Sequence, residues 1–348
     1  MVDLVDIDVT LTCPECGGQS RETMPTNRCV IFYDCSVCRV VLRPKPGDCC
    51  VFCSYGDRCC PFVQDDRRCL GEEKGALMNP NKALWEKGDF TEIAALMRQS
   101  GEAVVKALGI TPPLQALDLG CGDGTTAVPL ARLGADVVGI DIATNLVEAG
   151  NKRAKEAGLT RLVFQEGDAC DLQGVSDDTF DLTLSVFGAM FAPKPFDVAK
   201  EMVRVTRPGG RIVMGNWIPN DPTSFVSQLL KISSSFMPPP PEGFVSPMTW
   251  GVDTHIIERF GQAGVPKEKI SMVKDTFYFI SPDKSPTQVV ESFRRFYGPT
   301  MNAFEAAQKT GQVEELQNQL LELANAQNRS TDGSTSIPAT FLRVDVSL

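Results

Sequence analysis

The residues of this chain that are best suited to chemistry are cysteines near its N-terminus. Eleven of the thirteen cysteines lie at or before Cys69. Two pairs have the spacing CxxC, in "CPEC" and "CSVC", and eighteen residues separate the two pairs. Four thiolates at this spacing are suited to one tetrahedral Zn²⁺ held between two tight turns. We therefore predict a zinc site whose ligands are Cys13, Cys16, Cys35 and Cys38.

A second group of cysteines follows in the stretch "GDCCVFC". This stretch resembles the small bacterial GDCCVxC-domain proteins, and the likeness extends over residues 8–62. Some members of that family carry selenocysteine, so the resemblance implies redox or soft-metal chemistry. Two interpretations stay open for Cys49, Cys50 and Cys53: reactive thiols, or a second structural zinc or inert thiols. We favour reactive thiols, because adjacent side chains diverge and are poorly placed for one tetrahedral site.

A glycine-rich turn is the clearest signal in the rest of the chain. In "ALDLGCGDG" an apolar strand runs to Asp118, and Gly120, Gly122 and Gly124 then allow the backbone to approach a ligand closely. Such a turn suits either a dinucleotide or S-adenosylmethionine. The dinucleotide fingerprint needs a third glycine where this chain has Thr125. The glycines alone leave both ligands open.

Two carboxylates at predicted strand ends narrow the choice. Asp141 in "VVGIDIA" could accept hydrogen bonds from both hydroxyls of a ribose, and Asp168 in "EGDA" could accept one from an adenine amino group. The stretch "RPGGRI" makes a turn into a fifth strand. With these motifs the chain resembles the class I S-adenosylmethionine-dependent methyltransferases, in the subgroup of the ubiquinone and menaquinone biosynthesis methyltransferases. The resemblance covers residues 80–348 and does not identify the methyl acceptor.

The resemblance implies a role for each matching residue. The three glycines would line the methionine moiety above Asp118, Ile142 would pack on the adenine, and Trp85 with Phe90 would form a lid. The cofactor-binding residues implied in this way are Asp118, Gly120, Gly122, Gly124, Asp141, Ile142, Asp168, Ala169 and Trp85.

Motifs that the sequence lacks narrow the range of possible methyl acceptors. The tetrapeptide [D/N]-P-P-[Y/F], which methyltransferases acting on nucleobase and glutamine nitrogens use, does not follow the fourth predicted strand, where the chain has "SVFGAMFAPKP". Arsenite methyltransferases use several cysteines, whereas the second part of this chain has Cys121 and Cys170. Methyl transfer from a sulfonium needs positioning and exclusion of water more than it needs an acid–base pair.

The only histidine, His255, is a candidate general base, although an ordinary position on a helix is the interpretation we favour. Three aromatic residues could line an apolar acceptor pocket or pack in the core: Trp217, Phe244 and Trp250.

The elements that must position these residues alternate along the chain. A helix is expected over residues 88–109, with Asp89 as its N-cap, and strands and helices then alternate, which predicts a parallel sheet with helices on both faces. Helices near 286–297 and 303–327 precede a final strand, "PATFLRVDV". The predicted fold class is α/β, a Rossmann-like methyltransferase sheet with a small cysteine-rich, zinc-ribbon-like domain before it.

The abrupt change in cysteine content sets the predicted domain boundaries. Residues 1–70 form the cysteine-rich domain, 71–82 a linker containing Gly, Pro and charged residues, and 83–348 the methyltransferase domain.

Charge and hydropathy exclude several classes of protein. A net charge of −10 disfavours binding to nucleic acid, which needs clustered Lys and Arg. No run of apolar residues is long enough to span a membrane, and the start "MVDLVDIDVT" is unlike a signal peptide, so a cytoplasmic location is expected.

The function predicted is therefore methyl transfer from S-adenosylmethionine to an unidentified small molecule, with an N-terminal metal-binding or redox module. Two alternatives are a ribosomal RNA methyltransferase with a zinc-binding module and a metal(loid)-responsive or metal-buffering protein. The second cysteine group is the feature that the last alternative would explain.

Overall fold

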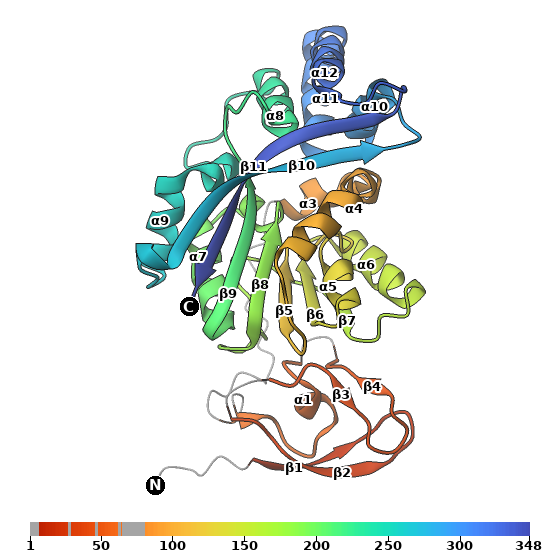
Figure 1. Ribbon diagram of the computed structural model, residues 1–348, viewed down its shortest axis with the longest axis vertical. Helices are drawn as coiled ribbons and strands as arrows, with labels where there is room; N and C mark the ends of the chain where they lie inside the picture. The colour runs from red at the N-terminus through yellow and green to blue at the C-terminus, as the bar shows by residue number, and fades with distance from the viewer. Residues whose placement is uncertain (1–6, 27–28, 46–47, 62–63, 65–80) are drawn as a thin grey trace.

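The computed structural model describes residues 7–26, 29–45, 48–61, 64 and 81–348 (Figure 1). The boundary predicted at residue 70, and Cys69 with it, lies outside the described residues. The last two residues predicted for the linker already belong to helix α3 (Asn81–Glu86).

A seven-stranded sheet, in the order β10-β11-β9-β8-β5-β6-β7, forms the centre of the larger part of the molecule. Strands β5 to β9 are parallel, as predicted, whereas β11 runs antiparallel between β9 and β10. The prediction of an all-parallel sheet is thus wrong at this edge, and β10 was not predicted at all. The strands are β5 (Gln115–Leu119), β6 (Asp136–Asp141), β7 (Leu162–Glu166), β8 (Phe180–Val186), β9 (Thr206–Trp217), β10 (Ile270–Ser281) and β11 (Thr335–Ser347).

Helices cover both faces of the sheet, as predicted. Successive strand residues point to opposite faces, so that Ala116 packs in one core cluster with Val105 and Leu117 packs in another with Met202. The expected helix at 88–109 is α4, and Asp89 caps it by accepting a hydrogen bond from the Thr91 amide. The helices of these two layers are α4 (Phe90–Ala107), α5 (Ala127–Arg132), α6 (Thr144–Glu156), α7 (Pro195–Val205) and α9 (Asp253–Gln262).

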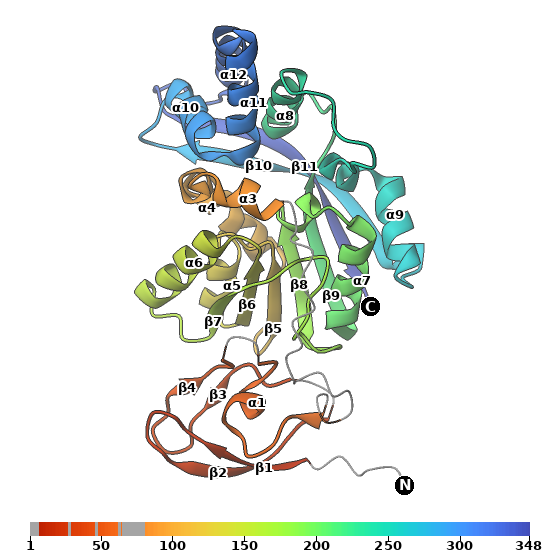
Figure 2. The same cartoon turned by 180° about the vertical axis from the view of Figure 1, so that it is seen from behind.

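Four further helices gather on the extension of β10 and β11 beyond the rest of the sheet (Figure 2). The single helix expected at 303–327 is two helices, because Gly311, with φ of 73°, ends the first of them in a left-handed conformation. The four are α8 (Phe225–Ser235), α10 (Pro286–Phe296), α11 (Gly298–Thr310) and α12 (Val313–Gln327). Short 3₁₀ turns are η1 (Ala189–Phe191), η2 (Pro247–Gly251) and η3 (Lys267–Lys269).

The described residues between 7 and 64, here called the cysteine module, pack around a separate cluster of buried side chains, and half of that cluster is cysteine. The module lies against the edge of the sheet where β6 and β7 begin (Figures 1 and 2). There Arg161, just before β7, pairs with Asp34 of the module and, at 3.1 Å, with Asp136. The elements of the module are β1 (Asp8–Thr12), β2 (Gln19–Thr23), β3 (Tyr33–Asp34), β4 (Val41–Leu42) and α1 (Val51–Tyr55).

Within the described ranges, none of the helices combines the length and the apolar character that a membrane crossing requires.

Candidate functional site

A cleft lies at the carboxyl ends of the parallel strands, on the side of the sheet away from the cysteine module. It encloses about 930 Å³, including its open mouth, a size suited to a cofactor or small molecule. Two of the residues predicted to bind the cofactor, Asp118 and Gly124, do not line it. The other predicted residues do: Trp85, Phe90, Gly120, Gly122, Asp141, Ile142, Asp168 and Ala169.

The glycine turn after β5 passes very close to the chain that follows β8. Gly120 has a φ of +67°, and a Cβ placed on it would lie 2.6 Å from the Gly188 Cα. No side chain fits in that space. The two backbone segments can therefore meet only because both positions are glycine, and their contact forms part of the cleft wall.

Asp141 ends β6 and holds the glycine turn in place. One oxygen of its carboxylate accepts a hydrogen bond from the Gly122 amide at 2.8 Å, and the other accepts one from the Ala143 amide at 3.0 Å. Burial raises the pKa of Asp141, and the backbone donors oppose that shift. Asp141 lines the cleft, so the lone pairs of its carboxylate that are not used by the two amides can accept hydrogen bonds from a ligand.

Asp118 lies beneath the turn and not in the cleft. It is buried within β5, and its carboxylate accepts a hydrogen bond at 2.6 Å from the Thr126 hydroxyl at the start of α5. Burial raises the pKa of Asp118 to about 7. Asp168, just beyond β7, lines the cleft and accepts a hydrogen bond from the Cys170 amide at 2.9 Å.

A buried ion pair beside the glycine turn was not predicted from the sequence. Asp123, only 2% exposed, pairs through both oxygens with the Arg98 guanidinium and lies 3.6 Å from Arg153. Arg98 also donates to the Thr125 hydroxyl at 2.8 Å. Asp123 itself could have indicated this ion pair in the sequence, because a carboxylate in a buried glycine turn needs a partner.

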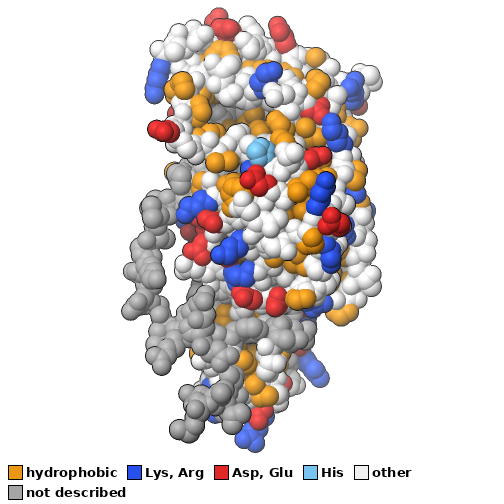
Figure 3. Space-filling view, turned by 90° about the vertical axis from the view of Figure 1, so that its left-hand side faces the viewer, with side chains coloured by type: hydrophobic (Ala, Val, Ile, Leu, Met, Phe, Trp, Pro, Cys, Tyr) orange, Lys and Arg blue, Asp and Glu red, His pale blue; other side chains and the backbone are white. Residues whose placement is uncertain are grey.

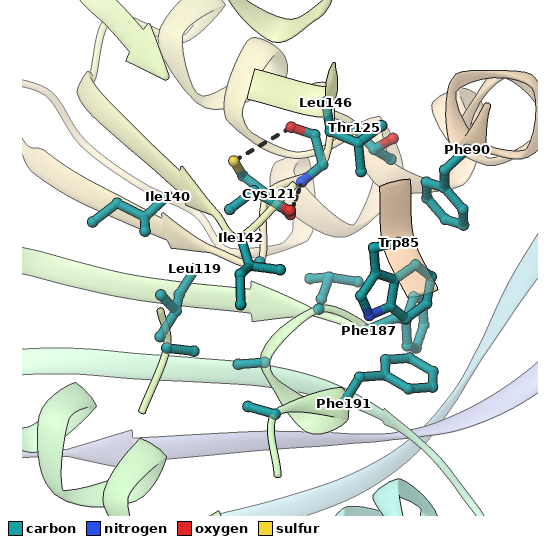
Figure 4. A pocket seen from close by; sticks show the side chains of 18 of the residues that line it. Trp85, Phe90, Leu119, Cys121, Thr125, Ile140, Ile142, Leu146, Phe187 and Phe191 are labelled. Carbon is teal, nitrogen blue, oxygen red and sulfur yellow. Dashed lines mark hydrogen bonds between the residues drawn. The ribbon is translucent and has the colours of Figure 1, made fainter. Parts of the chain in front are cut away.

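Aromatic side chains close one side of the cleft (Figure 4). The indole of Trp85, from α3, lies edge-on to Phe90 and to Phe191, with ring centroids 5.7 and 4.9 Å apart. Phe187, directly after β8, has a φ of 61°, which is rare outside glycine, and its ring stacks on Trp217 with centroids 3.5 Å apart. Such strained residues cluster at functional sites.

A second, apolar cavity of about 310 Å³ adjoins the cleft and shares some of its aromatic walls. Among the described residues that line it, Tyr297 alone has a hydroxyl, and burial raises the pKa of this residue. The cavity is lined by Trp85, Phe90, Ile93, Met97, Phe187, Phe191, Trp217, Val226, Phe279, Phe293 and Tyr297.

The remaining candidates lie in different environments. Trp217 lines the apolar cavity, whereas Trp250 is buried beneath the Arg259 guanidinium, which is 4.5 Å from its ring, and Phe244 is exposed. His255 lies on the outer surface of α9, 3.8 Å from Glu258, and lines neither cavity. The one histidine visible in Figure 3 lies at the surface, on a face where basic and acidic side chains are interspersed.

The structure brings the four cysteines of the two CxxC pairs together. Their sulfur atoms all lie within 4.8 Å of one another, and the Cys13–Cys38 and Cys16–Cys35 sulfur pairs are each 3.8 Å apart. A tetrahedron with metal–sulfur bonds of about 2.3 Å has edges of about 3.8 Å. Hydrogen bonds from the Cys38 and Val37 amides lower the pKa of the Cys35 thiol to about 6, which favours the thiolate that a metal needs.

The other predicted cysteines lie nearby in the module. Cys49 and Cys50 are buried, Cys53 is partly exposed, and the sulfur of Cys53 is 3.3 Å from that of Cys49. The expectation that adjacent cysteines diverge is wrong here, because the chain bends at this point to enter α1, and both sulfurs turn toward the same group of thiols.

Comparison with known proteins identifies the larger part of the chain. Residues 117–214 match the family model described as "Methyltransferase domain". An uncharacterized protein of Mycobacterium tuberculosis is 30% identical over 256 residues, covering 72% of this chain and 89% of the relative. A second protein of that organism is 31% identical over 235 residues, covering 67% and 82%.

A demethylmenaquinone methyltransferase of Beutenbergia cavernae is 38% identical over 115 residues, which is 33% of this chain and 45% of that enzyme. The chain therefore belongs to one family with these mycobacterial proteins, and it contains a methyltransferase domain.

Proposed function

We propose that this chain is a class I S-adenosylmethionine-dependent methyltransferase that acts on a small, largely apolar molecule, and that its first 70 residues form a separate zinc-binding domain. One observation carries the proposal. The cleft combines a glycine turn, in which Gly120 leaves no room for a side chain, with carboxylates at the ends of two adjacent parallel strands. Ligands of open α/β sheets bind at this edge.

The residues of the cleft fit the cofactor. Asp141 and Asp168 give the walls a negative character, which suits a cation and hydroxyl or amino donors. Asp141 would accept from the ribose, Asp168 and the Ala169 amide would contact the adenine, and Ile142 would pack on it. When bound, S-adenosylmethionine supplies an electrophilic methyl group on a sulfonium.

The protein's own contribution to the reaction is placement and exclusion of water. Trp85 and Phe191 cover the cleft, and Phe187, which stacks on Trp217, belongs to the walls of both the cleft and the adjoining apolar cavity. That cavity supports an acceptor with an aromatic or aliphatic body, and Tyr297 supplies a hydroxyl that could orient it. The net charge of −10 argues against ribosomal RNA as the acceptor.

The CxxC thiols fit one Zn²⁺. The sulfur–sulfur distances of 3.8 Å match a tetrahedral four-thiolate site, and Cys13, Cys16, Cys35 and Cys38 would be the ligands. The metal would then stabilise a segment with little core of its own.

The cofactor assignment is tested by titration calorimetry with S-adenosylmethionine. Asp141→Ala should weaken binding by about tenfold or more, because hydrogen bonds to a charged group contribute roughly 1.5–3 kcal/mol. Asp136→Ala, at the other end of the same strand, is the matched control and should leave the affinity unchanged. Equal affinity of the wild type and Asp141→Ala would contradict the assignment.

The acceptor class is tested with labelled cofactor and fractions of a metabolite extract separated by polarity. Label should enter the apolar fractions, and a bulky substitution in the apolar cavity, Val226→Phe, should reduce transfer while cofactor affinity stays unchanged. Transfer confined to polar fractions would contradict an apolar acceptor without affecting the cofactor assignment.

A further inference from the structure

We infer that Cys29, Cys49, Cys50 and Cys60 form a second metal site, for a divalent cation of the zinc class. Their four sulfur atoms lie within 4.8 Å of one another, as do the four sulfur atoms of the CxxC cysteines. The sulfurs of Cys49 and Cys60 are 3.5 Å apart, close to the edge of about 3.8 Å expected for a tetrahedral four-thiolate zinc site.

The ligands come from three separate places in the chain, so local sequence alone does not bring them together. The amide of Val51 donates to the carbonyl of Val30 at 2.8 Å and so fixes the segment after Cys29 beside the start of α1. Cys50, the N-cap of α1, is fully extended, with φ of −158° and ψ of 169°. Cys60 then returns to the same point after the helix.

Burial of the four thiols favours a metal over a reactive dithiol. Cys29, Cys49, Cys50 and Cys60 are between 0% and 8% exposed, whereas reactive cysteines are accessible. All four are free thiols. Together with Cys13 and Cys35 of the CxxC pairs they make up half of the buried cluster of the module. A segment of this size rarely folds on so few apolar side chains, and a metal is a common substitute.

A hydroxyl beside the site can donate a hydrogen bond to one of the four thiolates. The Ser176 hydroxyl, from the methyltransferase part of the chain, lies 2.9 Å from the Cys29 sulfur. Donors to sulfur offset the excess negative charge of four thiolates on one divalent ion.

Ser176 also gives the second site a structural role. It lies 147 residues from Cys29 in sequence, and the contact joins the cysteine module to the segment before β8. A metal at the second site would hold Cys29 in the position from which it meets Ser176. This site is therefore placed to secure the module against the sheet.

The number of metal ions per chain tests the inference. The full-length protein, supplied with zinc and freed of excess metal by gel filtration, should contain about two zinc ions per chain by elemental analysis, given four thiolates per ion. The double variant Cys29→Ser/Cys60→Ser should lose one of them, and so should Cys13→Ser/Cys16→Ser. Cys170→Ser, outside both groups, should lose none.

A measurement on the unaltered chain removes the dependence on variants that fail to fold. Cadmium NMR of the cadmium-substituted protein should show two resonances typical of four-thiolate coordination. Alkylation of the zinc-loaded protein should spare all four buried cysteines, and removal of the metal should expose them. One zinc per chain, retained by Cys29→Ser/Cys60→Ser, or a single cadmium resonance, would overturn the second site.

Discussion

The cleft and the cysteine module lie at opposite ends of the parallel strands of one sheet, and different interactions hold each of them together. The cleft is formed by backbone turns and carboxylates on a large core that includes side chains from both faces of the sheet. In the module, by contrast, the thiols that could bind metal are themselves half of the core. The cleft should therefore survive loss of the module's metal, and the module should not.

This separation also bears on the chemistry that the thiols can perform. The described module residues contact the sheet where β6 and β7 begin, through Arg161 and through Arg43, which donates to the Thr160 carbonyl at 3.1 Å. None of the module's described cysteines lines the cleft. A thiol-held substrate in the cleft is thus not supported, and the module is better explained as an accessory to the methyltransferase part.

The largest difference between the cysteine module and the cleft is expected when metal is removed from the whole protein. With a chelator present, we expect amide exchange to become fast across residues 8–26 and to stay slow across 115–141, because structural zinc contributes roughly 10–16 kcal/mol to folding in small zinc peptides. Hydrogen-exchange mass spectrometry measures both segments together. Loss of protection in the second segment as well would mean that the two regions are not independent.

A smaller effect is expected from crowding the glycine turn. In Gly120→Ala the new Cβ would meet the Gly188 backbone, whereas Gly109→Ala, also at positive φ, meets nothing within 4 Å. Both substitutions should cost about 1–2 kcal/mol for the left-handed backbone, and Gly120→Ala about 1–3 kcal/mol more for the collision. Urea unfolding compares the two. Equal losses would show that the turn has room that the structure does not indicate.

The pH dependence of the large core sharpens the contrast with a metal-held module. Asp118 has a pKa raised from 3.8 to about 7 by burial, so the folded state binds its proton more tightly than the unfolded state does. The protonated Asp118 stabilises the folded state at low pH. This stabilisation is lost as the pH rises from the unfolded pKa of 3.8 to the folded pKa of about 7, and roughly 2–3 kcal/mol of it is lost between about pH 5 and 7.

The matched variant for this effect is Asp118→Asn, which resembles the protonated acid at every pH. Urea unfolding of the cofactor-free protein at a series of pH values should show a slope in the wild type that is reduced in the variant. Parallel curves for the two proteins would contradict the raised pKa.

The smallest effect is expected at His255. Its side chain is 45% exposed on α9 and pairs only weakly with Glu258. His255→Ala should change the free energy of unfolding by no more than about 0.5 kcal/mol, as for most surface positions, and should leave methyl transfer unchanged. A large loss of kcat with unchanged cofactor affinity would instead make this residue part of the reaction.

Much of the fold and part of the site could be predicted from short stretches of sequence. The CxxC spacing, the cap at Asp89 and the glycine turn are local patterns, and each depends on the geometry of a few consecutive residues. The presence of β5 to β9 and their parallel direction followed from the alternation of strands and helices along most of this stretch, whereas their order in the sheet was not predicted. Strand β10 was missed because its burial is irregular, with many exposed positions, and so it lacks a clear period.

The residues that were missed have partners far away in the sequence. Cys29 has no cysteine next to it and Cys60 follows Cys59, but neither has the CxxC spacing that would mark it as a ligand of the same site as Cys49. Phe187 had no signal beyond its place after a predicted strand, and its partner Trp217 lies in another strand. Pairing of this kind depends on which segments the folded core brings together.

By itself, the sequence determined which backbone segments can approach a ligand and which residue types can bind a cation or a metal, because these properties depend on local conformation and on chemical groups. Only the tertiary structure decided that the cleft and the module lie at opposite ends of the parallel strands, that aromatic side chains from α3 and η1 meet at the cleft, and that five thiols converge beside α1. Those arrangements follow from burying separate apolar faces in common cores, a condition that involves the whole chain at once.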